Sequence, residues 1–389
     1  MKFICNENKC TGCCLCLNVC KHNAIKIIKG KIDAIYPTID TEKCINCGLC
    51  YKYCPSLNQC DYKYPKEAIA CWSKDEDDYK TSTSGGAASV ISNWAIDNGG
   101  IVYGCGTYKD KISHIRIDNK DDLWKLKGSK YTQSYITSDL YKQVKADLNN
   151  GKLVVFIGTP CQIAACKSYN KKNDDKLITV DLICHGVPSQ ELFVKNITDE
   201  LNINQIKQIK RISFRDSKTS DFLLSAIIFD NNNKEYNCKI NPFNPSYNDK
   251  YYCAFWYGWN YRKSCYNCVY AKDKRISDIT IGDFWGLKTK ELGINPTSGC
   301  SLMLINTERG EYVKEQIKER LFIYSRPIEE AIKGNAQLRS PTKLTLRGKF
   351  FRSIYKYCGL NISFNIAALD KVIISRIKRI IKLILFIKK

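Results

Sequence analysis

The sequence lacks the features that mark a secreted or membrane-spanning chain. Residues 1–6 include no apolar stretch of the kind a signal peptide needs. The apolar run at residues 383–387 is five residues long, whereas a spanning helix needs about twenty. A repeat of the kind that defines solenoid proteins is also missing. We therefore expect a globular, cytoplasmic protein.

Cysteine, by contrast, is abundant. The chain has 22 cysteines among 389 residues, and its apolar fraction of 44% is ordinary. This length allows two or three domains with cores of their own, and the composition does not predict disorder. A long chain without a signal peptide keeps its thiols reduced, so clustered cysteines indicate metal ligation rather than disulfide bonds.

Charge is distributed unevenly along the chain. The formal net charge is +22, and residues 343–389 contain twelve Lys or Arg and one acid, which gives +11. Thiolate-bound iron–sulfur clusters would lower the total. Composition and spacing predict five parts: a cysteine-rich domain at 1–60, a linker at 61–80, the two parts of an α/β domain at 81–150 and 151–340, and a basic tail at 341–389.

Residues 10–54 carry two copies of one cysteine motif. In each copy three cysteines are spaced by two residues and a fourth follows after three, at Cys10, Cys13, Cys16 and Cys20 and again at Cys44, Cys47, Cys50 and Cys54. In two-cluster ferredoxins the fourth cysteine of a run ligates the cluster of the other run. The spacing therefore predicts two 4Fe–4S clusters, one on Cys10, Cys13, Cys16 and Cys54 and one on Cys20, Cys44, Cys47 and Cys50.

Four other residues bear on this prediction. Gly12 and Gly48 favour it, because both loops must turn sharply with amides aimed at sulfur. Lys21 replaces the proline usual after the first run, which should affect loop rigidity or cluster potential rather than cluster number. Cys14 is an extra thiol that we interpret as a bystander. Zinc is the alternative metal, but it favours paired Cys-x2-Cys knuckles.

Apolar runs predict two buried strands, at residues 153–157 and 177–183, with a helix between them. Such a unit has parallel strands and a right-handed crossover. Cys161 and Cys184 follow these strands, so both should lie at the edge where open α/β sheets bind ligands. Cys265 and Cys268 form a later pair with metal-ligand spacing. The four thiols suit a third 4Fe–4S cluster; alternatively, the first two are buried thiols and the pair binds zinc.

Other patterns complete the α/β interpretation. Short strands are predicted at residues 101–103 and 112–117, a hairpin at 224–240, and helices at 138–149 and 308–321. A Gly-rich turn with Ser84, Gly85 and Gly86 precedes another helix, and such turns present free amides to phosphate. An ordinary serine N-cap explains these residues equally well. Lys130 is a cation in a loop of small residues.

Seven short motifs occur in a fixed order: TSGG at residues 83–86, GSKY at 128–131, GTPCQ at 158–162, DLICHGVPS at 181–189, ISFRD at 212–216, SCYNC at 264–268 and DITIGDFWG at 278–286. Together with the N-terminal two-cluster ferredoxin domain, they resemble the beta-subunit family of coenzyme F-420 hydrogenase and dehydrogenase over roughly residues 1–340. The resemblance implies a mixed α/β (α+β) fold with a flavin-binding catalytic domain. It also implies FAD beside a third 4Fe–4S cluster on Cys161, Cys184, Cys265 and Cys268, and a flavin role for Ser84, Gly85, Gly86, Lys130, Gly158, Thr159 and Pro160.

The function implied is that of a flavin- and iron–sulfur-dependent oxidoreductase or electron-input subunit, of the kind found in anaerobes. Electrons would pass between a redox partner protein or low-potential donor, the clusters, the flavin and an unidentified small-molecule substrate. His185 is a candidate proton donor and Asp283 a candidate polar contact, although a histidine satisfied by a backbone carbonyl is the simpler interpretation of the first. The alternative is a non-enzymatic iron–sulfur electron carrier or adaptor subunit of a larger complex.

The basic tail shows helical periodicity. Isoleucines recur at positions 373, 377, 380, 384 and 387, with Arg376, Lys378, Arg379 and Lys382 mostly elsewhere on the helical wheel. This pattern predicts a peripheral contact with an anionic membrane at its inner face, or with a partner's groove. A helix packed on the protein's own body is equally consistent. Nucleic acid is not expected as a partner, because no binding motif accompanies the charge.

Overall fold

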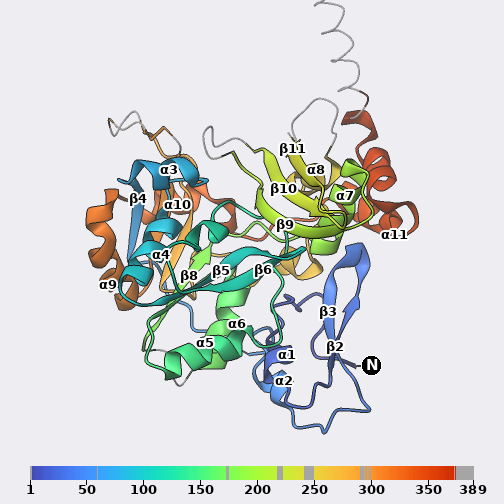
Figure 1. Cartoon of the computed structure of the whole chain (residues 1–389), viewed down its shortest axis with the longest axis horizontal. Helices are drawn as coiled ribbons and strands as arrows, with labels where there is room; N and C mark the ends of the chain where they lie inside the picture. Colours follow the sequence, from blue (N-terminus) through green and yellow to red (C-terminus); the bar gives the residue numbers. More distant parts are fainter. Residues whose placement is uncertain are drawn as a thin grey trace, which may run out of the picture.

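One large mixed β-sheet forms the centre of the protein. The structure, a computed structural model, describes residues 2–58, 60–171, 175–216, 222–240, 249–289, 293, 296–297, 299–371 and 373. Eight strands lie in the order β14–β4–β13–β12–β8–β7–β5–β6 (Figure 1). Their bounds are β4 Glu67–Ser73, β5 Ile101–Tyr108, β6 Lys111–Ile117, β7 Val154–Gly158, β8 Leu177–Leu182, β12 Ile279–Asp283, β13 Ser301–Ile305 and β14 Leu321–Arg326.

The strand directions bring several carboxyl ends to one edge of this sheet. Strands β5, β7, β8 and β12 are parallel neighbours. Strand β13 is antiparallel to both β12 and β4, so β4 runs in the same direction as the four. The predicted strand–helix–strand unit is confirmed, since β7 and β8 are parallel and α6 (Pro160–Asn170) lies between them in the chain.

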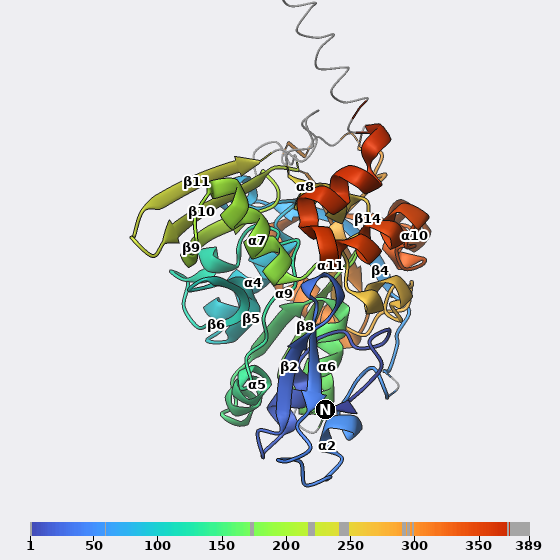
Figure 2. The same ribbon diagram turned by 90° about the vertical axis from the view of Figure 1, so that its right-hand side faces the viewer.

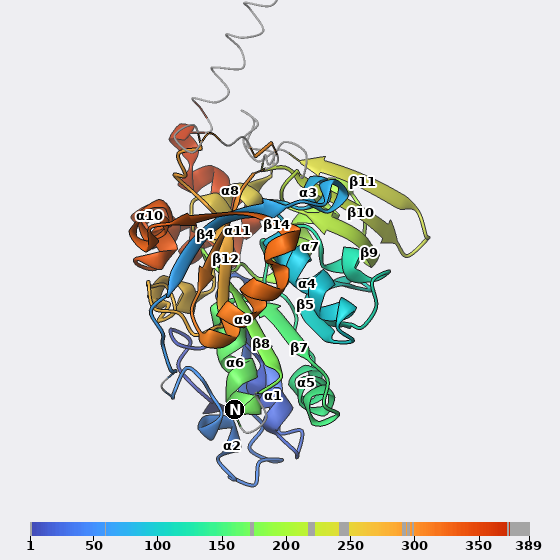
Figure 3. The same cartoon turned by 90° about the vertical axis from the view of Figure 1, so that its left-hand side faces the viewer.

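Helices cover both faces of the sheet, which explains the continuous apolar run in β7. Helices α4 (Ala87–Asp97) and α9 (Glu308–Ile317) pack together on one face (Figure 3). Helices α5 (Leu140–Asn149) and α6 cover the other face, where Tyr103 and Phe156 are fully buried. A smaller helix, α10 (Ile328–Gly334), packs near β4.

The segment expected to be a linker, residues 61–80, holds structure instead. Its strand β4 lies between β13 and β14 in the sheet, and Ala68, Ile69, Ala70 and Cys71 are completely buried there. Helix α3 (Glu76–Thr81) follows, capped by the Asp75 carboxylate, which accepts a hydrogen bond from the Asp78 amide at 2.7 Å. The polar residues that suggested a linker are therefore the N-terminus of a helix.

A second sheet lies beside the first. It has the order β11–β10–β9, with bounds β9 Ile206–Ser213, β10 Leu224–Asp230 and β11 Glu235–Ile240. The predicted hairpin is confirmed, because β10 and β11 are antiparallel. Helices α7 (Gln190–Leu201) and α8 (Lys250–Trp256) share its apolar core.

The cysteine-rich N-terminal domain forms a small sheet and two short helices at one end of the molecule (Figure 2). Its elements are β1 Lys2–Phe3, α1 Leu15–Val19, β2 Ile25–Lys29, β3 Ile35–Ile39 and α2 Leu49–Lys52. This domain docks on the α5–α6 face of the large sheet. The Asn18 side chain accepts a hydrogen bond from the Tyr141 amide at 3.0 Å, and the Tyr141 hydroxyl donates to the Cys13 carbonyl at 3.1 Å.

The last described helix, α11 (Leu346–Ala367), folds back on itself. Gly359 has φ +68° and ψ −175°, a conformation that side-chain-bearing residues rarely adopt. The reversal brings Arg347 to Asp370, whose carboxylate accepts two hydrogen bonds at 2.9 and 3.1 Å. Phe351 and Phe364, one from each half, are buried with Trp259. Of the tail positions that suggested an amphipathic helix, only 373 is among the described residues. No described helix is long and apolar enough to cross a membrane.

Candidate redox site

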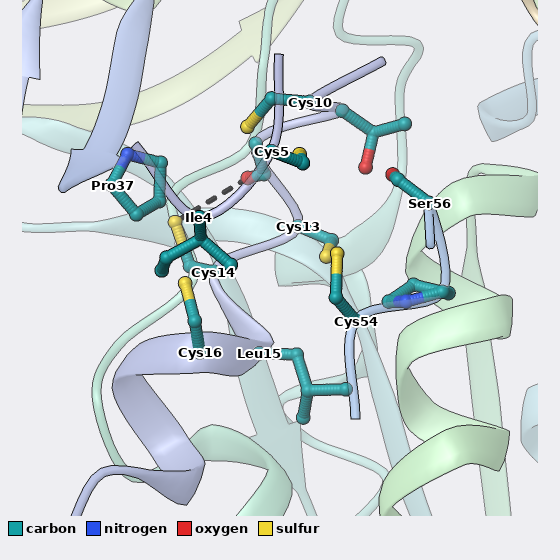
Figure 4. A pocket seen from close by; sticks show the side chains of 13 residues that line it. Ile4, Cys5, Cys10, Cys13, Cys14, Leu15, Cys16, Pro37, Cys54 and Ser56 are labelled. Atoms are coloured by element: carbon teal, nitrogen blue, oxygen red, sulfur yellow. Dashed lines mark hydrogen bonds between the residues drawn. The ribbon is translucent and has the colours of Figure 1, made fainter. Parts of the chain in front are cut away.

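The first predicted cluster site is a pocket in the N-terminal domain. The cysteines of the crossed assignment line it together: Cys10, Cys13, Cys16 and Cys54 (Figure 4). Figure 4 shows the sulfur atoms of Cys13 and Cys54 directed toward one another although the residues lie in different runs. Gly12 has φ +67°, and a Cβ there would lie 2.6 Å from the guanidinium of Arg262. The close turn at Gly12 thus leaves room for a buried cation next to the pocket.

The second predicted cluster site is a separate pocket. It is lined by the remaining members of the two runs, Cys20, Cys44, Cys47 and Cys50. Backbone amides point at two of these sulfurs, from Ala24 to Cys20 and from Asn46 to Cys44, each at 3.4 Å. Such amides stabilise negative charge on ligand sulfur. The structure therefore groups all eight cysteines as the spacing predicts.

The first pocket holds two thiols beyond its four predicted ligands. Cys14 is buried, and its Sγ donates to the Gly12 carbonyl at 3.4 Å (Figure 4). Cys5, which the sequence motif does not include, also lines the pocket. A hydrogen bond from Cys5 lowers the pKa of Cys10 to about 6 and that of Cys54 to about 7. Cys5 thus lies close to two of the predicted ligands, Cys10 and Cys54.

Arg262 is a second residue at this pocket that sequence reasoning missed. Its side chain is buried, and Nε donates to the Cys10 carbonyl at 2.8 Å. Nη1 donates to Gln133 Oε1 at 3.0 Å and Nη2 to the Ile35 carbonyl at 2.5 Å. The guanidinium therefore joins the ferredoxin loop, its sheet and the larger domain.

The four thiols of the third predicted cluster converge from three segments. Cys161 lies in the first turn of α6, Cys184 follows β8, and Cys265 and Cys268 lie in and directly after the short helix η3 (Lys263–Asn267). Burial raises the pKa of Cys161 to about 11 and that of Cys265 to about 12, and the neighbouring thiols add to the rise. Burial also raises the pKa of Cys184, and the other three thiols each raise it further. All four thus lie within electrostatic reach of each other.

We also searched the described residues for a site that suits a single metal ion. The described residues contain no group of three or more His, Cys, Asp or Glu side chains close enough to hold one ion. A cubane takes one cysteine at each of four iron atoms, so its ligand sulfurs stand further apart than those around one ion. The four half-buried thiols fit such a cluster in number, residue type and convergence.

The first and third thiol sets are neighbours. Cys161 contributes to the raised pKa of Cys13, whose main cause is burial. Both thiols also raise the pKa of Tyr270, which burial raises first. The hydroxyl of Thr159 lies 3.2 Å from the Cys161 sulfur. Cys13 and Cys161 are both partly buried and pack against the same apolar core.

The residues predicted to bind flavin lie at the same sheet edge or close to it. Gly85 follows α3, and its carbonyl accepts a hydrogen bond from the amide of Ser73, the last residue of β4, at 2.8 Å. A Cβ at Gly85 would lie 2.2 Å from the Cys71 carbonyl oxygen, so only glycine fits. Gly86 has φ +83° and precedes α4. The buried hydroxyl of Ser84 has no hydrogen-bond partner among the described residues. This orphaned donor next to a helix N-terminus fits an anionic group of a flavin nucleotide.

The segment Gly158–Thr159–Pro160 forms the N-terminus of α6, a structural role that the sequence did not predict. The Thr159 amide and hydroxyl each lie 3.0 Å from Gln162 Oε1, which caps α6, and Pro160 occupies its first position. Gly158 passes close to His114, with 3.1 Å between a built Cβ and Nε2. These contacts fix the turn that presents Cys161.

Two backbone carbonyl groups hold the Lys130 ammonium group. Its Nζ donates to Leu126 at 3.0 Å and to Lys127 at 2.8 Å, at the end of the short helix η2 (Leu123–Leu126). Burial lowers the pKa of Lys130 to about 8. The loop is tied to α3, because Lys127 Nζ pairs with Asp78 of that helix at 2.7 Å. A bound anion would favour the charged form of Lys130.

The two candidate catalytic residues belong to one polar group. Asp283, at the end of β12, forms a salt bridge with Arg215, whose side chain is 7% exposed. The Arg215 guanidinium lies 5.0 Å from the centre of the Phe222 ring. His185 is exposed at this edge, and partial desolvation lowers its pKa while Asp283 opposes the shift. Burial raises the pKa of the adjoining Tyr131 to about 12. Arg215 lies in the ISFRD motif at residues 212–216, but the sequence pattern did not identify it as a site residue.

A thiolate-lined N-terminal domain joined to an α/β domain with converging cysteines defines an iron–sulfur redox protein. Residues 9–58 match the 4Fe-4S dicluster domain, and residues 151–331 match the C terminus of the coenzyme F-420 hydrogenase/dehydrogenase beta subunit. The chain thus combines a dicluster domain with a domain of the coenzyme F-420 hydrogenase/dehydrogenase beta-subunit family, which confirms the resemblance of its motifs.

Two known proteins are similar to the chain. An uncharacterized protein of Methanocaldococcus jannaschii is 24% identical over 235 residues, which cover 50% of this chain and 64% of that protein. The match therefore spans less than two thirds of that relative's length. The structure of the F-420-reducing NiFe hydrogenase complex from Methanosarcina barkeri, derivatised with xenon, aligns at 16% identity with a TM-score of 0.44, over 70% of this chain and 90% of that chain.

Proposed function

We propose that this protein is a flavin- and iron–sulfur-dependent oxidoreductase, or the electron-input subunit of one, that acts on a small-molecule substrate in the cytoplasm. The observation that carries the proposal is the convergence of four half-buried thiols beside both the first ferredoxin pocket and the sheet edge. An electron carrier would need only the N-terminal domain. The extra thiols and the Arg215–Asp283 pair support a second redox group and a substrate site.

The chain offers a distinct set of residues to each group. The eight cysteines of the two pockets would hold two 4Fe–4S clusters, and Cys161, Cys184, Cys265 and Cys268 a third. Ser84, Gly85, Gly86 and Lys130 would receive the anionic part of FAD. When bound, the clusters would transfer electrons singly and the flavin would exchange them in pairs.

The remaining polar residues would prepare the substrate site. Arg215 fixes the direction of the Asp283 side chain at the edge of the sheet, because the two form a largely buried salt bridge. The lowered pKa of His185 favours a neutral ring at pH 7. A neutral imidazole at an exposed position accepts a proton from a substrate and returns it to water. Asp283 lies near enough to stabilise the imidazolium that results.

The test is the iron, sulfide and flavin content of the full chain purified without oxygen. We expect about twelve iron atoms and one flavin per chain. Replacement Cys265→Ser should lower iron to about eight, whereas Cys238→Ser, a buried thiol of β11 outside all three sets, should leave it unchanged. About twelve iron atoms without flavin would support an electron carrier instead, and about eight in the unmodified chain would remove the third cluster.

A further inference from the structure

A stripe of apolar side chains lies exposed along the second half of α11 and the turn that follows. Its members are 47–56% exposed: Ile362, Ile366, Leu369 and Ile373. Intervals of four, three and four residues place them on one side of a helix. The opposite side is packed, because Phe364, Ala367 and Ala368 are buried against α8 and Trp259. This helix therefore has two apolar faces, and the protein's own described residues cover one of them.

Isolated exposed leucines or isoleucines are ordinary on protein surfaces, but a periodic row is not. The row begins just after the reversal at Gly359, where the chain turns back along the first half of α11. Arg347 and Asp370 hold the two halves together from their outer ends. The salt bridge and the packed side of the helix thus hold the exposed stripe in place. About half of the surface of each of its side chains is open to a partner.

The sequence beyond the described residues continues the same pattern. Isoleucine recurs at positions 377, 380, 384 and 387, at intervals that extend the exposed stripe. Residues 371–389 also contain seven Lys or Arg and no acid.

We propose that the exposed stripe docks the protein on an anionic lipid bilayer as an interfacial amphipathic helix. Apolar side chains of this spacing enter the boundary between head groups and acyl chains, and flanking cations pair with acidic head groups. The charge favours this occupant over a second copy of the chain. A symmetric dimer through the stripe would bring two segments of like charge together.

Docking through α11 would also fix the orientation of the ferredoxin domain. The Tyr355 hydroxyl, on the first half of α11, donates to Asp33 Oδ2 at 2.6 Å. Lys195 of α7 pairs with the same carboxylate at 2.8 Å. The tip of the ferredoxin hairpin therefore contacts the helix that carries the exposed stripe. The N-terminal domain would be held at a defined position relative to the lipid surface.

The test is co-sedimentation of the full, cluster-loaded chain with vesicles. One set contains phosphatidylcholine alone, and the other contains phosphatidylcholine with phosphatidylglycerol. We expect binding about tenfold stronger to the second set, weakened by added salt. Ile366→Asp should reduce binding to the anionic vesicles about tenfold. Asn361→Asp, at an exposed polar position of the same half-helix, changes the charge equally and should have a smaller effect.

Iron content and the thermal midpoint separate loss of docking from loss of folding. Both should stay at the wild-type values in the two variants, and Ile362→Ser provides a second, uncharged test if Ile366→Asp fails to fold. Equal binding to both vesicle sets, or equal loss in Ile366→Asp and Asn361→Asp, would overturn the proposal. A dimer that forms in the wild type and dissociates in Ile366→Asp would assign the stripe to a second copy instead.

Discussion

Arg262 donates a hydrogen bond from Nε to the carbonyl oxygen of Cys10 at 2.8 Å, and its Nη2 lies 3.7 Å from the Cys10 sulfur. The carbonyl of Arg262 in turn accepts a hydrogen bond from the Cys265 amide at 3.0 Å. One buried residue therefore connects the first ferredoxin pocket with the third set of thiols. Its charge lies against the sulfur of a predicted ligand, where it has most influence on electron affinity.

Arg262→Gln should lower the reduction potential of one cluster. A buried cation stabilises the more negative, reduced form, so its removal makes reduction harder. The effect is measured by a redox titration followed by electron paramagnetic resonance. Glutamine also leaves the Ile35 carbonyl without its donor, and we expect the free energy of unfolding to fall by about 3 kcal/mol.

Arg320→Gln is the control for that change, because Arg320 forms a half-exposed salt bridge with Asp97 and contacts no predicted ligand. This control should leave all potentials at the wild-type values. An unchanged potential in Arg262→Gln with normal iron content would contradict a tuning role. Arg262→Lys should recover part of the potential, since lysine keeps the charge but lacks the planar fork.

Single replacements of the fourth cysteines should each remove the opposite cluster. Cys54 lies in the pocket of the first run and Cys20 in that of the second. Cys54→Ser should therefore abolish the signal that Arg262→Gln shifts, whereas Cys20→Ser should abolish the other ferredoxin signal. Each loss should lower iron by about four atoms. If Cys54→Ser removed the signal that does not respond to Arg262, the crossed assignment would be wrong.

Lys130→Met should reduce flavin content without a large loss of stability. The variant loses the hydrogen bonds to the Leu126 and Lys127 carbonyls but no longer buries a charge, whose cost is shown by a pKa of about 8. These effects oppose each other, so we expect the free energy of unfolding of the flavin-free protein to change by less than about 2 kcal/mol. Absorbance of released flavin gives the content, and urea unfolding gives the stability.

Lys176→Met is the matched control, because Lys176 also donates to a carbonyl, that of Gly151 at 2.8 Å, but is exposed. It should retain the wild-type flavin content. Full flavin content in Lys130→Met would exclude Lys130 from the flavin site and leave it as a cap of η2.

Local patterns account for the parts of the structure that were predictable. Strand β7 is a run of apolar residues followed by a turn, and the paired spacing of the cysteines encodes both pockets. Strand β4 was missed because its neighbours, β13 and β14, lie more than 200 residues away and its flanks are polar. Arg262 was missed for a related reason. Its partners Cys10 and Ile35 are distant in sequence, so only the tertiary fold distinguishes it from a surface arginine.

Gly359→Ala should destabilise the C-terminal helical hairpin. The glycine adopts a conformation that costs other residues about 1–3 kcal/mol. A built Cβ at Gly359 meets nothing within 4 Å, so the penalty is one of backbone conformation rather than collision. Thermal unfolding would report it. Gly293→Ala, also at positive φ with open space around it, controls for the loss of a left-handed glycine elsewhere. An unchanged midpoint in Gly359→Ala would show that α11 tolerates a straighter path.

His114 should make the fold sensitive to mild acid. The ring is 3% exposed, and its Nδ1 and Nε2 lie 2.6 Å from Ser134 Oγ and 3.1 Å from the Ile157 carbonyl. Burial lowers its pKa to about 4, whereas in the unfolded chain the ring takes up its proton near the ordinary histidine pKa of 6.5. Between these values the unfolded state binds more protons, so stability falls as the pH falls. The loss between pH 6.5 and pH 5 should be about 2 kcal/mol.

Urea unfolding at pH 7 and pH 5 measures this loss of stability, and His114→Gln should remove most of the difference. His22→Gln, at an exposed position, should retain the wild-type dependence. Equal pH dependence in His114→Gln and the wild type would assign the acid sensitivity to other groups.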